Sequence, residues 1–396
     1  MDSTQDRVAP QLGLGSLFLK FLGFGLLAFG GPVAQIAMVR QRLVEEERWI
    51  SPARFNRLLA VMQALPGPEA HELCVHMGMV ARGRLGGVLA GLGFMLPGFV
   101  LMLAAASAYV NWISDDLRFD GPLLGVQIVV LAVILRAVVR IGQHVLDGRL
   151  LLVVALLAML ASGFGVPFWI PLVTGGLVVA ASERPVLAGA LALGALGVAV
   201  AFDGSDVPAA AGVGHDLQTA SVLALFVAGL KGGLLTFGGA YTAIPYVRDD
   251  TVGRGWLEDS AFLDGIAIAG VLPAPLVIFA TFVGYVAGGL EGALAITAGM
   301  FLPAFGFSLL LFERLESLVE MPSLHRLLAG VAAAAVGVIG HGFLEIAGAT
   351  MGRVAVMPVA AVLFAVALGL VWRLKGGWVL PLVIGLGATA GALISL

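Results

Sequence analysis

The sequence predicts an all-α polytopic membrane protein, built from two homologous halves with inverted topology and containing broken or re-entrant helices. Composition is the first indication, because 60% of the 396 residues are hydrophobic and only 12% are charged, whereas a soluble domain carries about 25% charged residues. Apolar stretches of about 18 residues or more also recur along the chain, each long enough to cross a bilayer as a helix. Finally, one passage occurs twice, with helix-breaking residues at matched places, which is typical of secondary transporters.

The repeated passage has four landmarks in each copy: a Phe-Gly-Gly break, an arginine, a tryptophan and a Leu-Pro-x-Pro break. Phe29 and Phe237 are 208 residues apart (237 − 29), and Trp49 and Trp256 are 207 apart (256 − 49). Proline removes a backbone donor and glycine loosens a helix, so each break predicts an interrupted helix. The landmarks are Phe29-Gly30-Gly31, Arg40, Trp49 and Leu65-Pro66-Gly67-Pro68 in the first copy, and Phe237-Gly238-Gly239, Arg248, Trp256 and Leu272-Pro273-Ala274-Pro275 in the second.

Thirteen apolar segments are expected, in two groups. The first group is 12–39, 58–80, 85–112, 121–141, 150–166, 168–181 and 185–202, and the second is 220–246, 261–286, 290–312, 326–346, 354–372 and 377–396. A polar linker at 203–219 separates an N-terminal repeat (1–202) from a C-terminal repeat (220–396). Because an odd number of segments precedes the linker, the second half starts on the opposite face of the membrane.

Four segments contain the breaks, namely 12–39, 58–80, 220–246 and 261–286. If they cross fully, the arginine-rich loop at 40–57 and the short loop at 82–84 fall on opposite sides of the membrane. If they enter and leave on one face, both loops lie in the cytoplasm with the N-terminus. Cytoplasmic loops carry an excess of lysine and arginine, so the charges favour hairpins.

A helix that begins in mid-membrane exposes free N–H groups and the positive end of its dipole, which together form a site for an anion. Pro32 is expected to start a helix at 33–39 and Pro68 one at 69–80, with Ala240 and Pro275 at the matching places. The alternative is that glycine and proline only let helices pack closely. The candidate binding residues are Gly30, Gly31, Pro32, Gln35, Arg40, Gln63, Pro66, Gly67, Pro68, Gly238, Gly239, Tyr241, Thr242, Arg248, Pro273 and Pro275.

A polar stretch follows the first proline break and has no counterpart in the second half. Its ionisable residues Glu69, His71, Glu72 and His76 are expected at membrane depth, where such residues are costly and mark function. We interpret them as proton-coupling groups or as a balance for nearby arginines; capping of a half-helix is the alternative. The two histidines are five residues apart, so the spacing does not match a zinc-binding HExxH helix. His71, Cys74 and His76 could still bind a metal, but we expect no metal, cofactor or catalytic residue, and the chain is predicted not to be an enzyme.

The remaining features are less specific. The first residues contain no cleavage site of a signal peptide, and Cys74, as a single cysteine, excludes an intrachain disulfide. No basic run indicates nucleic acid. Lys20 and Lys231 lie in apolar sequence without matching across the repeats, and we interpret both as lysines that extend toward the membrane surface.

Several motifs together resemble those of the chromate transporter family in its long, two-domain form. In the first half they are F-G-G-P at 29–32, Q-A-L-P-G-P at 63–68 and F-M-L-P-G-F at 94–99. In the second half they are T-F-G-G at 236–239, L-P-A-P at 272–275, A-T-F-V-G-Y at 280–285 and F-L-P-A-F at 301–305. The chain departs from many relatives at Ala274, where they have glycine, and in the more charged stretch at 69–76.

The resemblance implies export of chromate, or a related tetrahedral oxyanion, across the inner membrane. The implied driving force is the membrane potential, the proton-motive force or exchange for sulfate. Uptake or exchange of sulfate or another small anion stays open, and an intramembrane metal-dependent enzyme is less favoured. The expected partners are the oxyanion and the lipid bilayer, no nucleic acid is expected, and a homodimer stays open.

The hairpin interpretation predicts the sidedness of two loops. Single cysteines placed at 45–50 and at 82–84 in a Cys74→Ser background should react with a membrane-impermeant maleimide from the same side. Labelling from opposite sides would show instead that segment 58–80 crosses the membrane.

Overall fold

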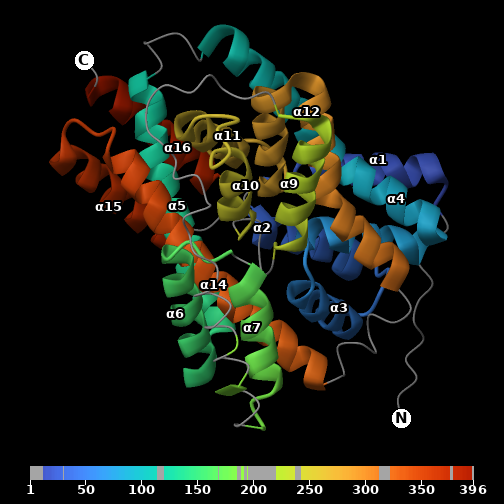
Figure 1. The fold of residues 1–396 in the computed structure, drawn as a ribbon. Coiled ribbons are helices and arrows are strands. Elements are labelled where there is room, and N and C mark those ends of the chain that lie inside the picture. Colours follow the sequence, from blue (N-terminus) through green and yellow to red (C-terminus); the bar gives the residue numbers. More distant parts are fainter. Residues whose placement is uncertain are drawn as a thin grey trace.

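The computed structural model describes residues 12–29, 31–113, 120–167, 169–184, 189–190, 194, 220–236, 242–311, 322–374 and 378–394. Every regular element in these residues is a helix, which confirms the all-α class (Figure 1). The first half contains α1 (Leu14–Leu26), α2 (Gly31–Val39), the π-helix η1 (Arg40–Glu46), α3 (Pro52–Ala64), α4 (Glu69–Ala108), the π-helix η2 (Tyr109–Ile113), α5 (Asp120–Val145), α6 (Arg149–Gly163) and α7 (Trp169–Ala180). The second contains α9 (Val222–Leu234), α10 (Ala243–Thr251), α11 (Asp259–Val271), the 3-10 helix η6 (Leu276–Ile278), α12 (Phe279–Leu311), α14 (Pro322–Met351), α15 (Met357–Arg373) and α16 (Val379–Ile394).

The predicted interruptions are present. In the first half the chain leaves helical structure between α1 and α2 and again between α3 and α4. In the second half it does so between α11 and η6, and α9 ends at Leu234, just before the second Phe-Gly-Gly break. Residues 237–241, the linker at 203–219 and most of the segment at 185–202 lie outside the described residues. The fold is therefore two homologous halves with helices broken at matched places.

The helix α4 is a hairpin of two antiparallel arms. Arg82 and Gly83 depart from helical geometry, Gly83 with φ of +63°, and the chain reverses there. As a result Gly78 meets Gly86 so closely that a methyl group on Gly78 would lie 2.4 Å from the Gly86 carbonyl oxygen. We call residues 69–81 the short arm and 84–108 the long arm of α4. The short arm is about 20 Å long, less than the roughly 30 Å hydrocarbon thickness of a bilayer.

The helix α12 repeats this hairpin in the second half. Gly288 and Gly289 break its helical geometry, and a methyl group on Gly284 would lie 2.5 Å from the Gly292 carbonyl oxygen. Residues 279–287 are its short arm and 290–311 its long arm. By length and apolar composition α4, α5, α12 and α14 could each span a membrane; in α4 and α12 only the long arm is long enough to cross.

The long arm of each half packs against the short arm of the other. The ring of Phe305, on the long arm of α12, stands edge-on to His71 on the short arm of α4, with centroids 4.7 Å apart. Tyr109, just after the long arm of α4, stands edge-on to Phe282 on the short arm of α12 at 4.9 Å. Reciprocal contacts of this kind relate two similar bodies by an approximate two-fold axis. Such an axis gives inverted halves when it lies in the membrane plane.

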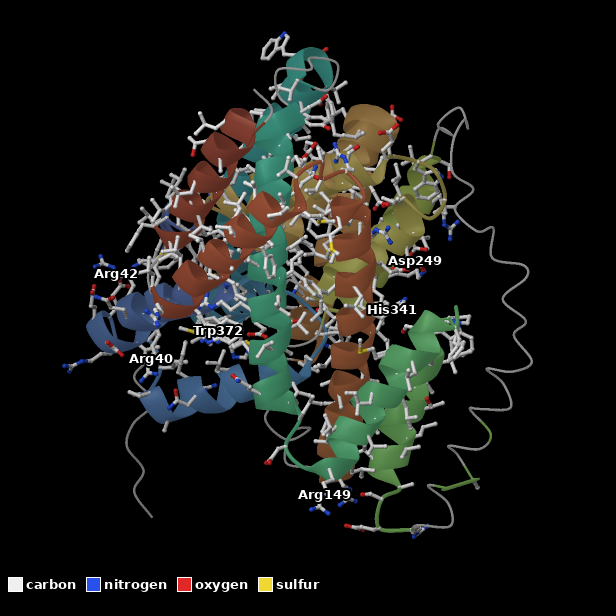
Figure 2. All side chains as sticks on the ribbon, turned by 90° about the vertical axis from the view of Figure 1, so that its left-hand side faces the viewer. Arg40, Arg42, Arg149, Asp249, His341 and Trp372 are labelled. Carbon is white, nitrogen blue, oxygen red and sulfur yellow. The ribbon has the colours of Figure 1, made fainter. Side chains whose placement is uncertain are left out.

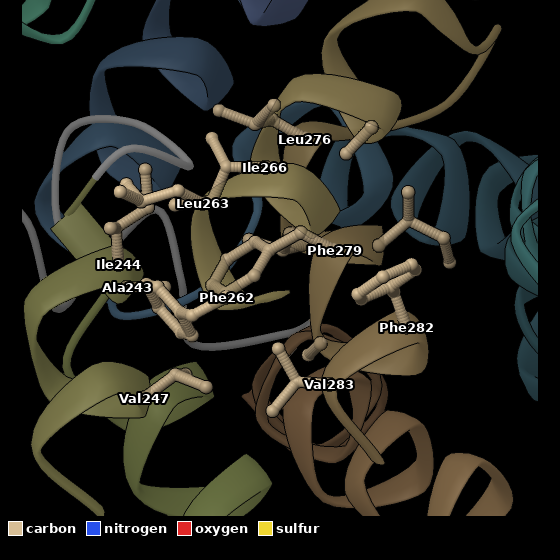
Figure 3. Close-up of a cluster of buried hydrophobic side chains, with 14 of the residues drawn as sticks. Ala243, Ile244, Val247, Phe262, Leu263, Ile266, Leu276, Phe279, Phe282 and Val283 are labelled. Atoms are coloured by element: carbon tan, nitrogen blue, oxygen red, sulfur yellow. The ribbon is translucent and has the colours of Figure 1, made fainter. Parts of the chain in front are cut away.

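Buried aromatic side chains fix the elements around each break. In the second half, Phe262 of α11 and Phe279 of α12 pack edge-on at 5.7 Å, within a cluster that also contains Ile244 of α10 (Figure 3). In the first half Trp49 and Phe55 are fully buried in a separate cluster with α1. The loops that carry the proline breaks are thus anchored on rigid surroundings.

The remaining helices form a scaffold beside the two hairpins. α14 packs against α6 and α7, and α5 packs against α15 and α16 (Figure 1). Helices of the first half therefore lie side by side with helices of the second. Large apolar side chains remain exposed on α6 and α15, including Leu157 and Val362, as expected for surfaces in contact with lipid.

Our interpretation of the two lysines was wrong. Lys20 on α1 pairs with Glu47, at 2.6 Å from Oε1, and Lys231 on α9 pairs with Asp250 at 2.6 Å. Both are partly buried rather than extended toward a membrane surface. Lys20 ties α1 to the residue after η1, and Lys231 ties α9 to the last turn of α10. The pairs escaped notice because the lysines occupy different positions in the two repeats.

The Glu47 carboxylate lies outside the hairpins and also accepts a hydrogen bond from Trp49 Nε1 at 2.9 Å. Burial raises the pKa of Glu47, but the bonds from Lys20 and Trp49 outweigh this effect and hold it below its ordinary value. A carboxyl whose pKa is depressed on folding stabilises the fold above its unfolded pKa, about 4.3, and the effect is lost as the pH falls through the folded pKa.

Glu47→Gln should therefore lower the thermal unfolding midpoint at pH 7, and the difference from the parent protein should shrink below about pH 4. Glu46→Gln is the matched control, because Glu46 pairs with Arg42 on the exposed surface, where such pairs contribute about 0–1 kcal/mol. An equal loss in both variants, or a loss independent of pH, would contradict this account. Scanning calorimetry in detergent measures the effect.

Candidate functional site

The proline break of each half contacts the Phe-Gly-Gly region of the other half. The Gly67 N–H donates to the Thr236 carbonyl at 2.8 Å. Gln35 Nε2 donates to two carbonyls, that of Ala28 at 2.8 Å and that of Ala274 at 3.0 Å. Ala28 and Thr236 are equivalent in the repeat, 208 residues apart (236 − 28). We call each contact between the proline break of one half and the residue before the Phe-Gly-Gly motif of the other a crossing. The first is a direct backbone hydrogen bond and the second is bridged by the Gln35 side chain, and both bring together residues more than 150 positions apart.

Small residues allow the two halves to approach each other at both crossings. The proline break contributes a glycine at one crossing and an alanine at the other. At one crossing Gly67 faces Ala304, whose Cα would lie 3.5 Å from a methyl group on Gly67. At the other, Ala274 faces Gly98, and a methyl group on Gly98 would lie 2.3 Å from the Ala274 Cβ. Gly98 and Ala304 are equivalent in the repeat (304 − 98 = 206). Each crossing thus pairs one glycine with one alanine, which explains why the second proline break reads Pro-Ala-Pro.

Helices begin at these crossings without side-chain caps. α2 starts at Gly31, where φ is +78°, with Pro32 as its second residue. α4 starts at Glu69 after Pro68, and η6 starts at Leu276 after Pro275, and neither start has a side-chain cap. The predicted starts at Pro32 and Pro68 are confirmed to within one residue. Uncapped helix starts present N–H groups and a partial positive charge.

The Glu72 carboxylate lies at the crossing made by Gly67. It is 1% exposed, and neither oxygen has a hydrogen-bond partner among the residues that the structure describes. A methyl group on Gly67 would lie 2.3 Å from Glu72 Oε1, so the carboxylate rests against the Pro-Gly-Pro loop. A buried carboxylate without a partner is costly when ionised, and it is the kind of group that binds a proton or a cation.

The other predicted coupling residues are also buried. Glu69 is 6% exposed and lies one turn from Glu72, and His76 is 1% exposed near Arg54. The His71 ring is enclosed by Phe301 at 4.9 Å and Phe305 at 4.7 Å. All four predicted residues therefore lie on the buried short arm of α4, while the short arm of α12 carries no histidine, aspartate, glutamate, lysine or arginine.

The two repeat-matched arginines are both ion-paired. Arg40 is partly exposed and lies near Glu45 at 3.2 Å, at the edge of the molecule (Figure 2). Arg248 makes a bidentate pair with Asp259, at 2.6 and 2.8 Å, and also contacts Glu345 at 3.3 Å. His341 and Asp249 lie near this second group, on α14 and α10 (Figure 2). The arginines belong to charged groups of their own, and their ion pairs in the described part of the chain involve Glu45, Asp259 and Glu345 rather than residues of the crossings.

Some of the candidate binding residues, or their side chains, lie outside the part of the chain that the structure describes. Gly30, Gly238, Gly239 and Tyr241 lie outside the described residues, as does the Gln63 side chain. Thr242 is fully buried at the start of α10.

One buried polar network was missed by the sequence analysis. Asp264 on α11 is 2% exposed, and its two oxygens accept hydrogen bonds from Tyr109 Oη at 2.9 Å and Gln127 Nε2 at 2.8 Å. Gln127 Oε1 in turn accepts a bond from Arg353 at 3.0 Å. The available signal was an aspartate within the apolar segment 261–286, since ionisable residues at membrane depth mark function.

Comparison with known proteins decides the family. The model of the family described as "Chromate transporter" matches residues 15–180 and 223–392, one region in each half. The chain belongs to the chromate transporter family. It is 53% identical to the chromate transport protein of Pseudomonas aeruginosa, over 99% of this chain and 95% of the relative. It is 31% identical to that of Cupriavidus metallidurans, over 84% and 82% of the two chains. No solved structure matches.

The reciprocal pairing of glycine and alanine can be tested by exchange. Gly98→Ala should destabilise this chromate transporter family member by about 1–3 kcal/mol, because an added methyl group overpacks the crossing. Ala274→Gly in the same chain should restore much of the loss, since it removes the atom that clashes. Thermal unfolding in detergent measures both effects.

Gly306→Ala is the control for this pair, because the space beside Gly306 is open although it lies two residues from Ala304. Its unfolding midpoint should equal that of the parent. A Gly98→Ala loss that Ala274→Gly leaves unchanged would show that the two residues do not meet.

Proposed function

We propose that the protein is a secondary transporter that exports chromate, or a closely related tetrahedral oxyanion, across the inner membrane. The observation that carries the proposal is the double crossing, which places an uncapped helix start next to each contact between the halves. Its family and the names of its relatives as chromate transport proteins support the substrate. The N-terminus in the cytoplasm follows from the distribution of arginines.

The chemistry of a tetrahedral dianion suits the crossings. Each of its oxygens accepts hydrogen bonds from N–H groups, and a helix start offers several such groups together with a positive dipole end. The starts after Pro68 and Pro275 come from opposite halves, so the anion would be held between them. Glycine or alanine at the crossings keeps bulky side chains away from the backbone.

Glu72 is the proposed coupling group. Because its carboxylate lies against the same loop, an ionised Glu72 would repel a dianion at the start of the short arm. A protonated Glu72 removes that repulsion. Binding of the anion would therefore be linked to a proton on Glu72, with Glu69, His71 and His76 shaping its surroundings. If the proton leaves with the dianion it moves against an inward pH gradient, so the electrical part of the proton-motive force, the membrane potential, or exchange for sulfate has to supply the drive.

Alternating access would come from rocking of one half against the other about the crossings, as in other transporters built from related halves. Uptake or exchange of sulfate is the alternative function, since sulfate is also a tetrahedral dianion. Measuring labelled chromate in inside-out vesicles, with and without excess sulfate, separates the two. Accumulation of chromate supports export. No chromate uptake together with sulfate transport would support the alternative.

Two backbone variants test the binding site. Gly31→Ala forces a side chain into a conformation with φ of +78°, and Pro68→Ala changes the start of α4. Both should lower chromate transport by about tenfold or more with normal insertion, because they move N–H groups that no side chain can replace. Normal rates in both variants would exclude the crossings as the site. Transport per folded molecule in vesicles gives the answer.

Glu72→Gln tests the coupling group. Glutamine has nearly the same size but cannot carry the proton, so the variant should lose its response to a pH gradient and keep its response to membrane potential. Asp250→Asn is the control, because Asp250 is also a buried carboxylate but pairs with Lys231 within the second half. An unchanged response of Glu72→Gln to the pH gradient would contradict the assignment.

A further inference from the structure

We propose that Tyr109, Gln127 and Asp264 form a latch that joins the two halves in one state of the transport cycle and opens in the other. Asp264 is a positioning residue in this latch, because it acts through the helices that carry the crossings. The inference rests on the proposed function in so far as the cycle moves an anion.

The latch joins elements of both halves. Tyr109 on η2 and Gln127 on α5 belong to the first half, and Asp264 on α11 belongs to the second. Both donors bond to one carboxylate, which is 2% exposed, while Gln127 is fully buried. Buried hydrogen bonds to a charged group are among the stronger ones in proteins. Separation of the halves at this point has to break both.

The latch residues Tyr109 and Asp264 lie close in sequence to Gly98 and Ala274, which meet at one of the two crossings. Tyr109 follows the long arm of α4, eleven residues after Gly98 (109 − 98), and Asp264 is ten residues before Ala274 (274 − 264). Tyr109 also packs its ring on Phe282 of the short arm of α12. These contacts hold α11, and with it the Pro-Ala-Pro loop, against the first half.

The hydrogen bonds from Tyr109 and Gln127 to Asp264 can break in the other state of the cycle, because both donors are neutral side chains. Tyrosine and glutamine side chains also form hydrogen bonds with other groups when they move away. The charged groups around the carboxylate are Arg353, which reaches it through Gln127, and the acids Asp120 and Glu258. Within the described residues, no lysine or arginine forms an ion pair with Asp264 that would fix it permanently.

The latch occurs once, although the fold is repeated. The position that matches Asp264 in the first half is Arg57 (264 − 207), and the position that matches Tyr109 in the second is Leu315 (109 + 206). The two crossings are therefore not equivalent: one is latched by Asp264, and the other carries the unpartnered Glu72. An asymmetry of this kind gives the two states of the cycle different energies.

Tyr109→Phe and Asp264→Asn weaken the latch without removing bulk. Loss of a hydrogen bond to a charged group should shift the equilibrium between the two states by about tenfold. The apparent KM for the anion should then rise on one face of the membrane and fall on the other. Right-side-out and inside-out vesicles measure the two values. The double variant should shift them by less than the sum of the two single changes, since Asp264→Asn removes the charge that strengthens the Tyr109 hydrogen bond and Tyr109→Phe removes that bond.

A second readout needs no transport. In a Cys74→Ser background, Leu276→Cys places a buried thiol (Leu276 is 5% exposed) just after the Pro-Ala-Pro loop. Tyr109→Phe and Asp264→Asn should each increase its rate of maleimide labelling by about tenfold, because the latched state protects it. Asp250→Asn is the control, since its partners Lys231 and Arg254 lie in the same half.

The latch is established if Tyr109→Phe and Asp264→Asn shift the KM in opposite directions at the two faces and speed up labelling, while Asp250→Asn does neither. If Tyr109 and Asp264 have only a structural role, their variants should lower the thermal stability and leave KM unchanged at both faces, and labelling should rise equally in Asp250→Asn. That result would overturn the latch. If the parent protein moves no chromate or sulfate, the proposed function fails, while the labelling rates still decide for or against the latch.

Discussion

The structure depends on one constraint, which is that interrupted helices inside a membrane must find partners for the peptide groups they leave free. In hydrocarbon each unsatisfied peptide group costs several kcal/mol. Here the two halves supply each other: the Gly67 N–H donates to Thr236 of the second half, and the Ala274 carbonyl accepts from Gln35 of the first. The breaks of each half therefore find part of their hydrogen-bond partners in the other half.

The hairpins α4 and α12 follow from the same constraint. Each folds back at a glycine with positive φ, and the long arm of one half then covers the short arm of the other. This arrangement buries the starts of α4 at Glu69 and of η6 at Leu276, where electrostatic effects are strong. It also places Glu72 beside one crossing and Asp264 near the other. The two halves therefore share a backbone arrangement but differ in the ionisable side chains at their crossings.

Much of this architecture could be predicted from the sequence. The breaks, the helix starts at Pro32 and Pro68 and the family were readable because glycine and proline have local effects on the backbone. The hydrogen-bond partner of each break could not be predicted, because Gln35 and Ala274 are 239 positions apart and occupy different places in the repeat. The role of Ala274 was hidden for the same reason, since its size only makes sense opposite Gly98. Asp264 and the pairs of Lys20 and Lys231 were missed because a single charge in an apolar segment does not reveal its partner.

The most direct measurement is the position of a bound anion. A structure determined with chromate, located by the anomalous scattering of chromium, should show the ion between the helix starts that follow Pro68 and Pro275, within hydrogen-bond distance of backbone N–H groups from both halves. An ion held instead by Arg248, Arg40 or another charged surface group, with nothing at the crossings, would contradict the account.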